Sequence, residues 1–460
     1  MATSAPAVTG LVDLLDRQVR ARPHAPALLV GDGRAPLSYE ELDALAGRAA
    51  ERCVAAGLRT GDVLALVAGN SAEFVGVLLG AARAGVVVAP LDPMLPEGEL
   101  QARVDQLGAR AVCTGDGRIA VRDGRAVRRD GALVLFTAGA TGRARTVPLT
   151  HTNVAAAVNT VCSTYALGPE DATVAVMPFF HGHGLFASLL STLASGGRVL
   201  LPAGGRFVAE TFWTDLRAAG ASWFTAVPRV HEELLDRSEA ADIPVPPPLR
   251  FVRSCGAPLN AATQRALERM FGAPLLSAYG MTEASHQMAS EPLPQDGPLK
   301  HGTVGRATGV RLRVVGRDGR ECAAGVRGEV WVSGPTVAGE GWLRTGDLGS
   351  LDEDGYLSLA GRIESLIVRR GLSISPEYVE DVLAGCPAVA EAAVFAVGGE
   401  GIRAAAVVQG DECVEPSEIL RYCRERLAAV AVPDRVVFVS ALPRTAQGGL
   451  DRVAVRERYG

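Results

Sequence analysis

The chain has 460 residues, of which 48% are hydrophobic and 21% are charged. This length is too great for one compact core and suits two or three domains of ~100 to 200 residues each. The net charge is -5 and no run of lysine or arginine is present, which argues against a nucleic-acid-binding or anionic-membrane-binding surface.

The cysteines and the apolar runs indicate the cellular compartment of the protein. The eight cysteines show no disulfide or metal-ligand spacing, and the N-terminus lacks a basic stretch followed by an apolar one. The longest apolar runs, such as Val86 to Pro90, are far shorter than the ~20 residues of a membrane span. We therefore expect a cytoplasmic protein that does not enter the membrane.

Helical patterns alternate with short apolar runs along most of the chain. Tyr39 to Ala56 has helix spacing, with Ser38 as a possible cap and Glu41 three residues later. A helix is also predicted at Ala72 to Ala84, and strands are predicted at Val63 to Val67, Val86 to Pro90, Val174 to Pro178, Arg198 to Pro202, Trp223 to Val227 and Arg250 to Ser254. This alternation predicts a mostly parallel sheet with helices on its faces.

The pattern changes after Gly341, where turn-rich polar segments separate single strands and two clear helices. The helices are predicted at Pro376 to Ala384 and Pro416 to Leu427. A small, separate C-terminal domain is therefore expected to begin near Gly361.

A loop rich in small and hydroxyl residues, Thr137 to Arg145, directly follows the apolar run Leu133 to Phe136. Such a loop lets backbone N–H groups approach phosphate oxygens, and Arg143 and Arg145 add positive charge. An isolated loop of this kind is about as often a solvent-exposed turn.

A second motif, Tyr279-Gly-Met-Thr-Glu283, follows the predicted strand Leu275 to Ala278. An aromatic ring can stack on adenine, a hydroxyl can bond a phosphate, and a carboxylate can hold Mg2+. By itself the motif is a weak signal.

The third motif combines Arg344-Thr-Gly-Asp347 with Asp354-Gly-Tyr356 and Gly361-Arg362. Asp347 can accept hydrogen bonds from both hydroxyls of a ribose, and Arg362 can donate to the same sugar or to a phosphate. The Asp-Gly-Tyr element alone is more often a hairpin turn.

In this order and at these intervals, the three motifs resemble the AMP-binding superfamily of acyl-CoA synthetases, luciferases and peptide-synthetase adenylation domains. The resemblance implies an enzyme that uses ATP and Mg2+ to make a mixed anhydride with AMP. It also implies an α/β plus α+β fold. Residues 1–361 would form an AMP-binding domain of doubly wound sheets with a small barrel-like subdomain, and residues 362–460 a small mobile C-terminal domain.

The resemblance also implies roles for individual residues. Thr282 would touch the α-phosphate, Glu283 would bind Mg2+, Arg145 would replace the lysine of the phosphate loop, and Glu364 would lie at the interdomain hinge. The nucleotide would further be held by the phosphate loop, the adenine-lining residues and the ribose pair, namely Thr137, Gly139, Thr141, Gly142, Gly256, Ala257, Pro258, Tyr279, Gly280, Asp347 and Arg362.

Several segments are similar to the oxalyl-CoA synthetase subgroup, among them Pro178 to Gly184, Trp223 to Pro228, Arg253 to Cys255 and Glu283 to His286. The segments suggest a small pocket for a compact anion, lined by His181, His183, Trp223, Arg253, Ser285 and His286. His181 is also a candidate for a catalytic role. Any single histidine in such a set is more often a packed core residue, and the turn after Glu283 could face adenosine instead.

The C-terminal signature departs from the family. Pro443 to Leu450 matches its Pro-Arg-Thr-x-x-Gly-Lys pattern except that Gly449 replaces the lysine, and Lys300 is the only lysine in the chain. Losing that cation should cost a few kcal/mol of transition-state stabilisation, or ~100-fold or more in rate. The segments Gly371 to Pro376 and Val430 to Pro433 lack further family lysines, and the loop Ala396 to Arg403 is short. These losses put the use of CoA in doubt.

Three hypotheses follow. The leading one is an adenylating enzyme that activates a small oxyanion, with nitrite and an aromatic amine as the substrates of an ATP-dependent diazotase in natural-product biosynthesis. The second is an acid-CoA ligase similar to oxalyl-CoA synthetases, in which Arg444 or Arg452 replaces the lysine. The third is a non-enzymatic nucleotide-binding protein. In each case the partners are small molecules.

Overall fold

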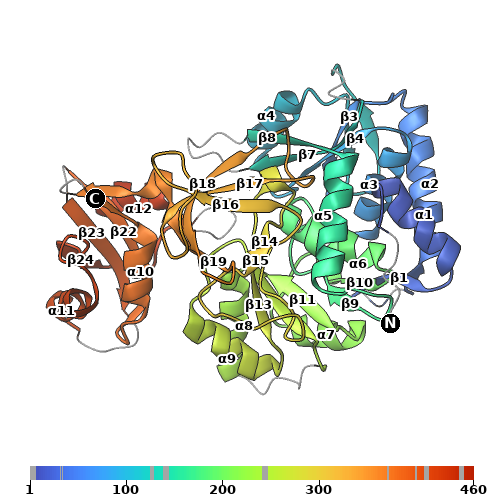
Figure 1. The fold of residues 1–460 in the computed structure, drawn as a ribbon. Helices are drawn as coiled ribbons and strands as arrows, with labels where there is room; N and C mark the ends of the chain where they lie inside the picture. Colours follow the sequence, from blue (N-terminus) through green and yellow to red (C-terminus); the bar gives the residue numbers. More distant parts are fainter. Residues whose placement is uncertain are drawn as a thin grey trace. The chain divides into compact units, whose positions relative to one another are not determined.

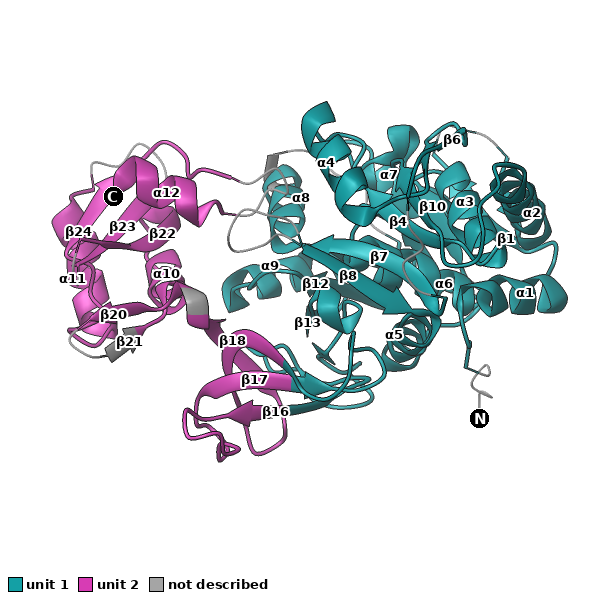
Figure 2. Cartoon of the chain, turned by 90° about the horizontal axis from the view of Figure 1, so that it is seen from above, with its two compact units in different colours: residues 1–312, 332–343 teal, residues 313–331, 344–460 magenta. Residues whose placement is uncertain are grey.

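The computed structural model describes residues 7–31, 33, 35–124, 129–137, 145–240, 247–369, 372–398, 401–408, 414–444 and 450–460 (Figure 1). They form two compact units, coloured teal and magenta in Figure 2. Unit 1 spans Met1–Leu312 and Val332–Leu343, and unit 2 spans Arg313–Trp331 and Arg344–Gly460. A functional boundary at residue 361 stays a prediction.

The largest sheet of unit 1 has the strand order β6-β5-β3-β4-β7-β8. Its inner strands run parallel, whereas β6 and β8 pair antiparallel at the edges. The strands are β3 (Val63–Val67), β4 (Val87–Leu91), β5 (Ala111–Thr114), β6 (Ile119–Val121), β7 (Gly131–Thr137) and β8 (Arg145–Thr150). Residues of β4 are buried along the whole strand, which is typical of a parallel sheet covered by helices on both faces.

Two more sheets complete unit 1, with the orders β2-β1-β10-β9 and β11-β12-β13-β14-β15. Their strands are β1 (Pro26–Val30), β2 (Leu37–Ser38), β9 (Ala172–Val174), β10 (Arg198–Leu201), β11 (Trp223–Ala226), β12 (Phe251–Cys255), β13 (Leu275–Tyr279), β14 (Ala289–Ser290) and β15 (Arg306–Ala307). Strands β11, β12 and β13 are parallel neighbours, so their carboxyl ends meet at one edge, the usual place for a ligand in such a sheet.

The helices of unit 1 follow the sequence signals closely. They are α1 (Leu11–Ala21), α2 (Tyr39–Ala55), α3 (Ala72–Arg83), α4 (Glu97–Leu107), α5 (His151–Thr164), α6 (Ser191–Ala194), α7 (Phe212–Ala219), α8 (Pro228–Ala240) and α9 (Ala261–Phe271), with a π-helix at His183–Leu190 and single turns at Ala203–Gly205 and Thr282–Ala284. The predicted cap of α2 is confirmed, because Ser38 and Glu41 exchange side-chain and backbone hydrogen bonds in a capping box.

The strand predicted at Val174 to Pro178 is wrong in its position, because β9 ends at Val174. Ala175 still bonds β10, since its N–H donates to the Leu200 carbonyl at 2.8 Å, and a side chain holds the segment as far as Met177. The amide of Asn70 donates to the carbonyl oxygens of Ala175 at 3.2 Å and Met177 at 3.0 Å. A local pattern of apolar residues could not reveal this distant partner.

Unit 2 contains most of the sheet β16-β17-β18-β19 and a small α+β assembly. The strands are β16 (Arg311–Val315), β17 (Gly328–Ser333), β18 (Leu343–Leu351), β19 (Leu357–Arg362), β20 (Ile367–Arg369), β21 (Leu372–Ile374), β22 (Val389–Val397), β23 (Gly401–Val408) and β24 (Arg435–Phe438). The helices are α10 (Pro376–Ala384), α11 (Pro416–Arg426) and α12 (Arg452–Tyr459), with a turn at Ile363–Ser365. The predicted fold class, α/β followed by α+β, is confirmed.

Hydrophobic side chains of α10, α11 and the sheet β22-β23-β24 form the core of the C-terminal assembly. The turn Asp352 to Tyr356 joins β18 and β19, with the Asp352 N–H donating to the Tyr356 carbonyl, so the hairpin interpretation of this motif is confirmed. Across the described ranges, none of the helices combines the length and apolar character needed to cross a membrane.

Candidate active site

The carboxyl end of β13 turns sharply after Tyr279. A side chain at Gly280 would place its Cβ 1.2 Å from the carbonyl oxygen of His286, so only glycine fits at that position. Ser285 and His286 both have positive φ angles, 51° and 85°, which non-glycine residues seldom adopt. Two positive angles in a row commonly mark a functional site whose surroundings enforce the conformation.

Hydrogen bonds to a neighbouring segment fix this turn. The Ser285 hydroxyl donates to the Thr336 carbonyl at 2.7 Å, and the Ala338 N–H donates to the Glu283 carbonyl at 2.7 Å. The turn therefore holds the His286 ring in one orientation.

The guanidinium of Arg253, on β12, lies at the centre of a buried polar cluster that we call the Arg253 cluster. Arg253 is 0% exposed. Its hydrogen-bond partners are Tyr165 Oη at 2.8 Å, Thr225 Oγ1 at 3.0 Å, His183 Nε2 at 3.2 Å, His286 Nε2 at 3.1 Å and Gln287 Oε1 at 3.0 Å. All these partners are neutral groups, and among the described residues no carboxylate forms an ion pair with Arg253.

The surroundings of the two histidines of the cluster favour the neutral form of both rings. Their rings stack with centroids 4.9 Å apart and an interplanar angle of 21°. Burial holds the pKa of His183 well below its usual range, and the neighbouring His286 and Arg253 lower it further. Burial and then the Arg253 charge likewise hold the pKa of His286 far below the usual value. The positive charge of the cluster is therefore that of Arg253 alone.

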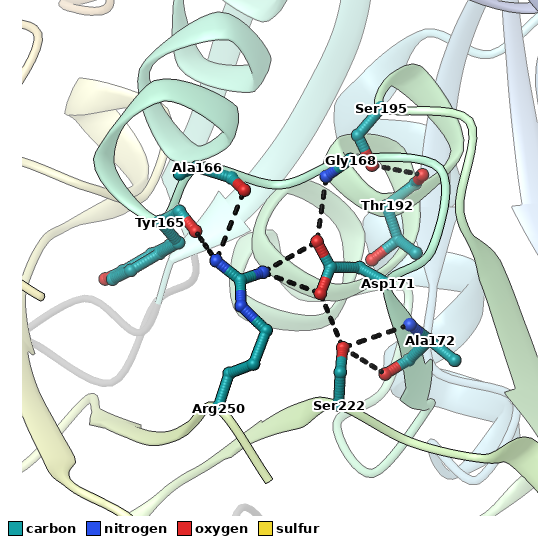
Figure 3. Close-up of polar contacts among 9 residues, drawn as sticks. All are labelled: Tyr165, Ala166, Gly168, Asp171, Ala172, Thr192, Ser195, Ser222 and Arg250. Carbon is teal, nitrogen blue, oxygen red and sulfur yellow. Dashed lines mark hydrogen bonds and ion pairs between the residues drawn. The ribbon is translucent and has the colours of Figure 1, made fainter. Parts of the chain in front are cut away.

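Arg250, directly before β12, shows what an ordinary structural arginine looks like in this fold (Figure 3). Its guanidinium donates to both carboxylate oxygens of Asp171, at 2.6 and 2.7 Å, and to the carbonyl of Tyr165 at 3.0 Å. Asp171 is held in turn by Ser222 at 2.6 Å. One nitrogen of Arg250 thus contacts both oxygens of a carboxylate, whereas the fully buried Arg253 has no carboxylate partner among the described residues.

The structure thus brings His183, Arg253 and His286 together, as the sequence suggested, but it places His181 and Trp223 differently. No described hydrogen bond joins the His181 ring to the Arg253 cluster, and its ring lies 4.7 Å from that of Phe180. Burial lowers the pKa of His181. Trp223 is fully buried in an aromatic stack, 5.3 Å from the Phe251 ring. Their pocket roles stay predictions.

Tyr165, Thr225 and Gln287 belong to the cluster but were missed in the sequence. Tyr165 directly follows α5, and its hydroxyl bonds both Gln287 at 3.0 Å and Ser290 at 2.8 Å. Gln287 and Thr225 carried a signal, since Gln287 directly follows His286 and Thr225 lies within the segment Trp223 to Pro228. Tyr165 lies in none of the segments that suggested the pocket.

The predicted phosphate loop is described only at its two ends. Thr137 ends β7 and Arg145 begins β8, and the two residues are paired across this antiparallel hairpin. Gly139, Thr141 and Gly142 lie outside the described residues. Gly256, Ala257 and Pro258 lie in an exposed turn directly after β12, with a φ of 99° at Gly256.

The predicted ribose pair lies in unit 2. Asp347 on β18 and Arg362 on β19 are paired residues, and the Arg362 Nε lies 3.1 Å from the Asp347 carboxylate. Arg362 also donates to the Thr345 carbonyl at 3.3 Å. The pair therefore presents a carboxylate whose orientation is already set.

Both arginines that were suggested as replacements for the missing lysine are already paired with carboxylates. Both Arg452 terminal nitrogens donate to the Glu380 carboxylate at 2.7 Å, and Arg444 is paired with Glu391. Burial lowers the pKa of Arg452, but the hydrogen bond to Glu380 and the charges of Glu380 and Glu377 together outweigh burial and raise the pKa above its usual value. Gly449 itself lies outside the described residues.

The comparisons with known proteins agree with this arrangement. The model of the AMP-binding enzyme family matches residues 15–128 and 119–340, and that of the AMP-binding enzyme C-terminal domain matches residues 378–448. An oxalate–CoA ligase of Arabidopsis thaliana is 37% identical over 98% of this chain and 98% of its own length. A sulfoacetate–CoA ligase of Cupriavidus necator is 31% identical over 94% of each chain.

Among solved structures, the ATP-bound MatB from Rhodopseudomonas palustris matches with a TM-score of 0.87 at 28% identity, covering 98% of this chain and 99% of that chain. The o-succinylbenzoate CoA synthetase from Bacillus subtilis matches with a TM-score of 0.83 at 26% identity over 97% of both chains. The chain therefore belongs to the AMP-binding enzyme family and is an adenylate-forming ligase.

Proposed function

We propose that this ligase adenylates a small oxyanion bound at the Arg253 cluster, with ATP as the second substrate. The observation that carries the proposal is the buried charge of Arg253, which no described carboxylate neutralises. An unpaired cation in a dry site is costly, so a bound anion would lower that cost. Relatives that act on oxalate and sulfoacetate, both small anions, support it.

The nucleotide would lie against the ends of β12 and β13. In this proposal Gly256, Ala257, Pro258, Tyr279 and Gly280 contact adenine, with Thr282 at the α-phosphate, because these residues occupy the motif positions quoted above. The carboxyl edge of parallel strands is where such ligands bind. Asp347 and Arg362 would hold the ribose through a charged hydrogen-bonding pair.

The residues present fit a magnesium ion. Glu283 is partly exposed, and no described residue forms a hydrogen bond or ion pair with its carboxylate. The described residues contain no group of three metal-binding side chains, which suits Mg2+, an ion commonly bound by one or two carboxylates plus phosphates. When bound, the ion would neutralise phosphate charge.

For the second substrate, we propose nitrite activation followed by transfer to an aromatic amine. The nitrite oxygen would attack the α-phosphorus of ATP and displace pyrophosphate. The amine nitrogen would then attack the nitrosyl nitrogen and release AMP, and loss of water would give the diazonium ion. The glycine at position 449, in a chain whose only lysine is Lys300, favours a substrate that needs less help at adenylation.

An acid-CoA ligase is the second candidate function. The similarity to CoA ligases over nearly the whole chain favours it. Both candidates use the same anion pocket and nucleotide site, and they differ in the acid and in the acceptor.

One experiment separates the two. The enzyme is incubated with ATP, Mg2+ and either nitrite or oxalate, with either an arylamine or CoA, and AMP and products are measured by mass spectrometry. A diazotase releases AMP and a diazo product only with nitrite and the amine. AMP and a thioester with oxalate and CoA would reject the diazotase in favour of the ligase, and no AMP with any pair would reject both.

A further inference from the structure

Arg253 has no N–H group left for a ligand. A guanidinium carries five N–H donors and cannot accept a hydrogen bond. The five partners in the Arg253 cluster are all protein atoms, at 2.8 to 3.2 Å. An anion that bound this guanidinium directly would have to displace one of them.

The same bonds fix the protonation of both histidines. His183 Nε2 and His286 Nε2 face Arg253 nitrogens at 3.2 and 3.1 Å, and because the arginine can only donate, both Nε2 atoms must accept. A neutral imidazole carries one proton, so that proton lies on Nδ1 in each ring. The Thr225 hydroxyl accepts from Arg253 at 3.0 Å and also lies 2.6 Å from His183 Nε2, so this hydroxyl is a second polar neighbour of that atom.

The two Nδ1–H groups are therefore the donors that remain. Within the described ranges, neither Nδ1 atom has a hydrogen-bond partner, and neither is among the buried polar atoms that lack one. The side chains keep a little of their surface exposed, 8% for His183 and 7% for His286. Both donors can therefore be reached from outside the cluster.

We propose that His183 and His286 bind the acid through their Nδ1–H groups. Arg253 is then a positioning residue: it fixes the tautomer of both rings and supplies positive charge on the Nε2 side of each ring, opposite the acid. This inference rests on the proposed function of the pocket. Two N–H donors on stacked neighbouring rings suit an anion with two oxygens on one atom, a property that carboxylates and nitrite share.

The tautomers can be measured without turnover. The wild-type chain is labelled with 15N-histidine, and the resonances of His183 and His286 are assigned with single His→Asn variants among the seven histidines. At pH 7 we expect a protonated Nδ1 and a bare Nε2 in both rings. A protonated Nε2 in either ring overturns the inference, whichever acid the enzyme uses.

The role of Arg253 is tested by Arg253→Gln and Arg253→Met, with Arg250→Lys as the matched control. Arg250 lies three residues away and bonds Asp171 instead of the histidines. We expect mixed tautomers in either Arg253 variant and unchanged ones in the control. Unchanged tautomers in a folded Arg253 variant would show that another group fixes the rings and would overturn the positioning role.

The donor atoms are tested by kinetics. The amide of asparagine lies close to the place of Nδ1, whereas that of glutamine lies near Nε2. We expect His286→Gln and His183→Gln to raise the KM of the acid, with oxalate and nitrite as probes, by roughly ten- to a hundredfold, since a hydrogen bond to an ion is lost. The asparagine variants should lose less, and the KM of ATP should stay unchanged.

Equal losses in the asparagine and glutamine variants would overturn Nδ1 as the donor. Failure of the proposed function is a separate result, namely no AMP release by the wild type with any acid. A shift of the two Nδ1 resonances when oxalate or nitrite is added would support the inference even then, and an absence of any shift would contradict it.

Discussion

The side-chain oxygen of Asn70 accepts the backbone N–H of Phe179 at 2.8 Å, although 109 residues separate the two. Together with its bonds to Ala175 and Met177, this amide holds the segment that leads into the π-helix beginning at His183. Asn70 is only 3% exposed. The shape of the proposed anion pocket should thus depend on a residue in the loop between β3 and α3.

Replacing Asn70 with alanine should lower the free energy of unfolding by about 2 to 4 kcal/mol, because buried backbone groups lose their partners. It should also raise the KM of the acid, since His183 loses its support. Urea unfolding and steady-state kinetics measure the two effects. Asn159→Ala, which breaks a similar amide clamp on Val8, should change stability alone. An unchanged acid KM in the Asn70 variant would contradict this role.

Asp347→Ala should raise the KM of ATP by roughly ten- to a hundredfold, because a charged hydrogen bond to the ribose is lost. The acid KM should change little. Glu329→Gln is the control, since Glu329 is also an acid paired with an arginine, Arg344 at 2.8 Å. If both variants affected ATP equally, the change would reflect the sheet and not the nucleotide.

Glu283→Gln should reduce AMP formation by roughly 100-fold or more, because the proposed Mg2+ ligand is removed. The rate is followed over a range of Mg2+ concentrations, and higher Mg2+ should recover part of it. Glu268→Gln, which removes an acid paired with His301 at 3.0 Å, should keep the wild-type rate. Full activity of the Glu283 variant at low Mg2+ would reject the assignment.

Gly449→Lys tests two explanations for the missing lysine. Either its loss has weakened a CoA ligase, or the substrate of this enzyme does not require it. In a diazotase the new lysine should leave AMP release with nitrite unchanged or lower it. In a weakened CoA ligase it should raise adenylation of oxalate by roughly 100-fold. Gly449→Met, with a long side chain and no charge, is the control. A large gain with oxalate and CoA would reject nitrite as the substrate.

Folding stability should fall on the acid side of pH 6.5. Burial lowers the pKa of His231 from 6.5 to about 4. The unfolded state therefore binds more protons than the folded state between these values, and stability is lost as the pH falls, by about 1.4 kcal/mol per pH unit. The lowered pKa values of His183 and His286 act in the same direction.

His231→Gln should make the free energy of unfolding less dependent on pH between 4 and 6.5. The carboxyl groups contribute equally to the pH dependence of both proteins. The difference between the unfolding free energies of variant and wild type, measured by urea unfolding, therefore reports on His231. An identical slope in the His231 variant would show that this ring is protonated as easily in the folded state as in the unfolded one.

Local signals in the sequence predicted much of the fold. The α2 cap depends on residues three positions apart, Ser38 and Glu41, so the pattern contained the whole interaction. The run that became β3, Val-Leu-Ala-Leu-Val, was recognisable because strands buried on both faces are often continuously apolar. Both kinds of signal are confined to neighbouring residues.

The candidate site was only partly predictable, since its contacts join distant residues. Arg253, His183 and His286 came from motif resemblance, but nothing around Tyr165 indicated that its hydroxyl would bond Arg253, 88 residues away. The stacking of the Trp223 ring on Phe251 was likewise not indicated by any local pattern, and the pocket role of Trp223 stays a prediction. Such contacts depend on how the sheet and helices pack, which no local pattern contains.

The saturation of Arg253 also has a kinetic consequence. A guanidinium held by five hydrogen bonds is already confined to one rotamer before the acid binds. Binding should therefore cost little side-chain entropy, and the proposed pocket is preorganised. Acids should then differ mainly in how fast they leave, and association should be fast and similar for all of them. A rigid site of this kind selects its substrate by residence time.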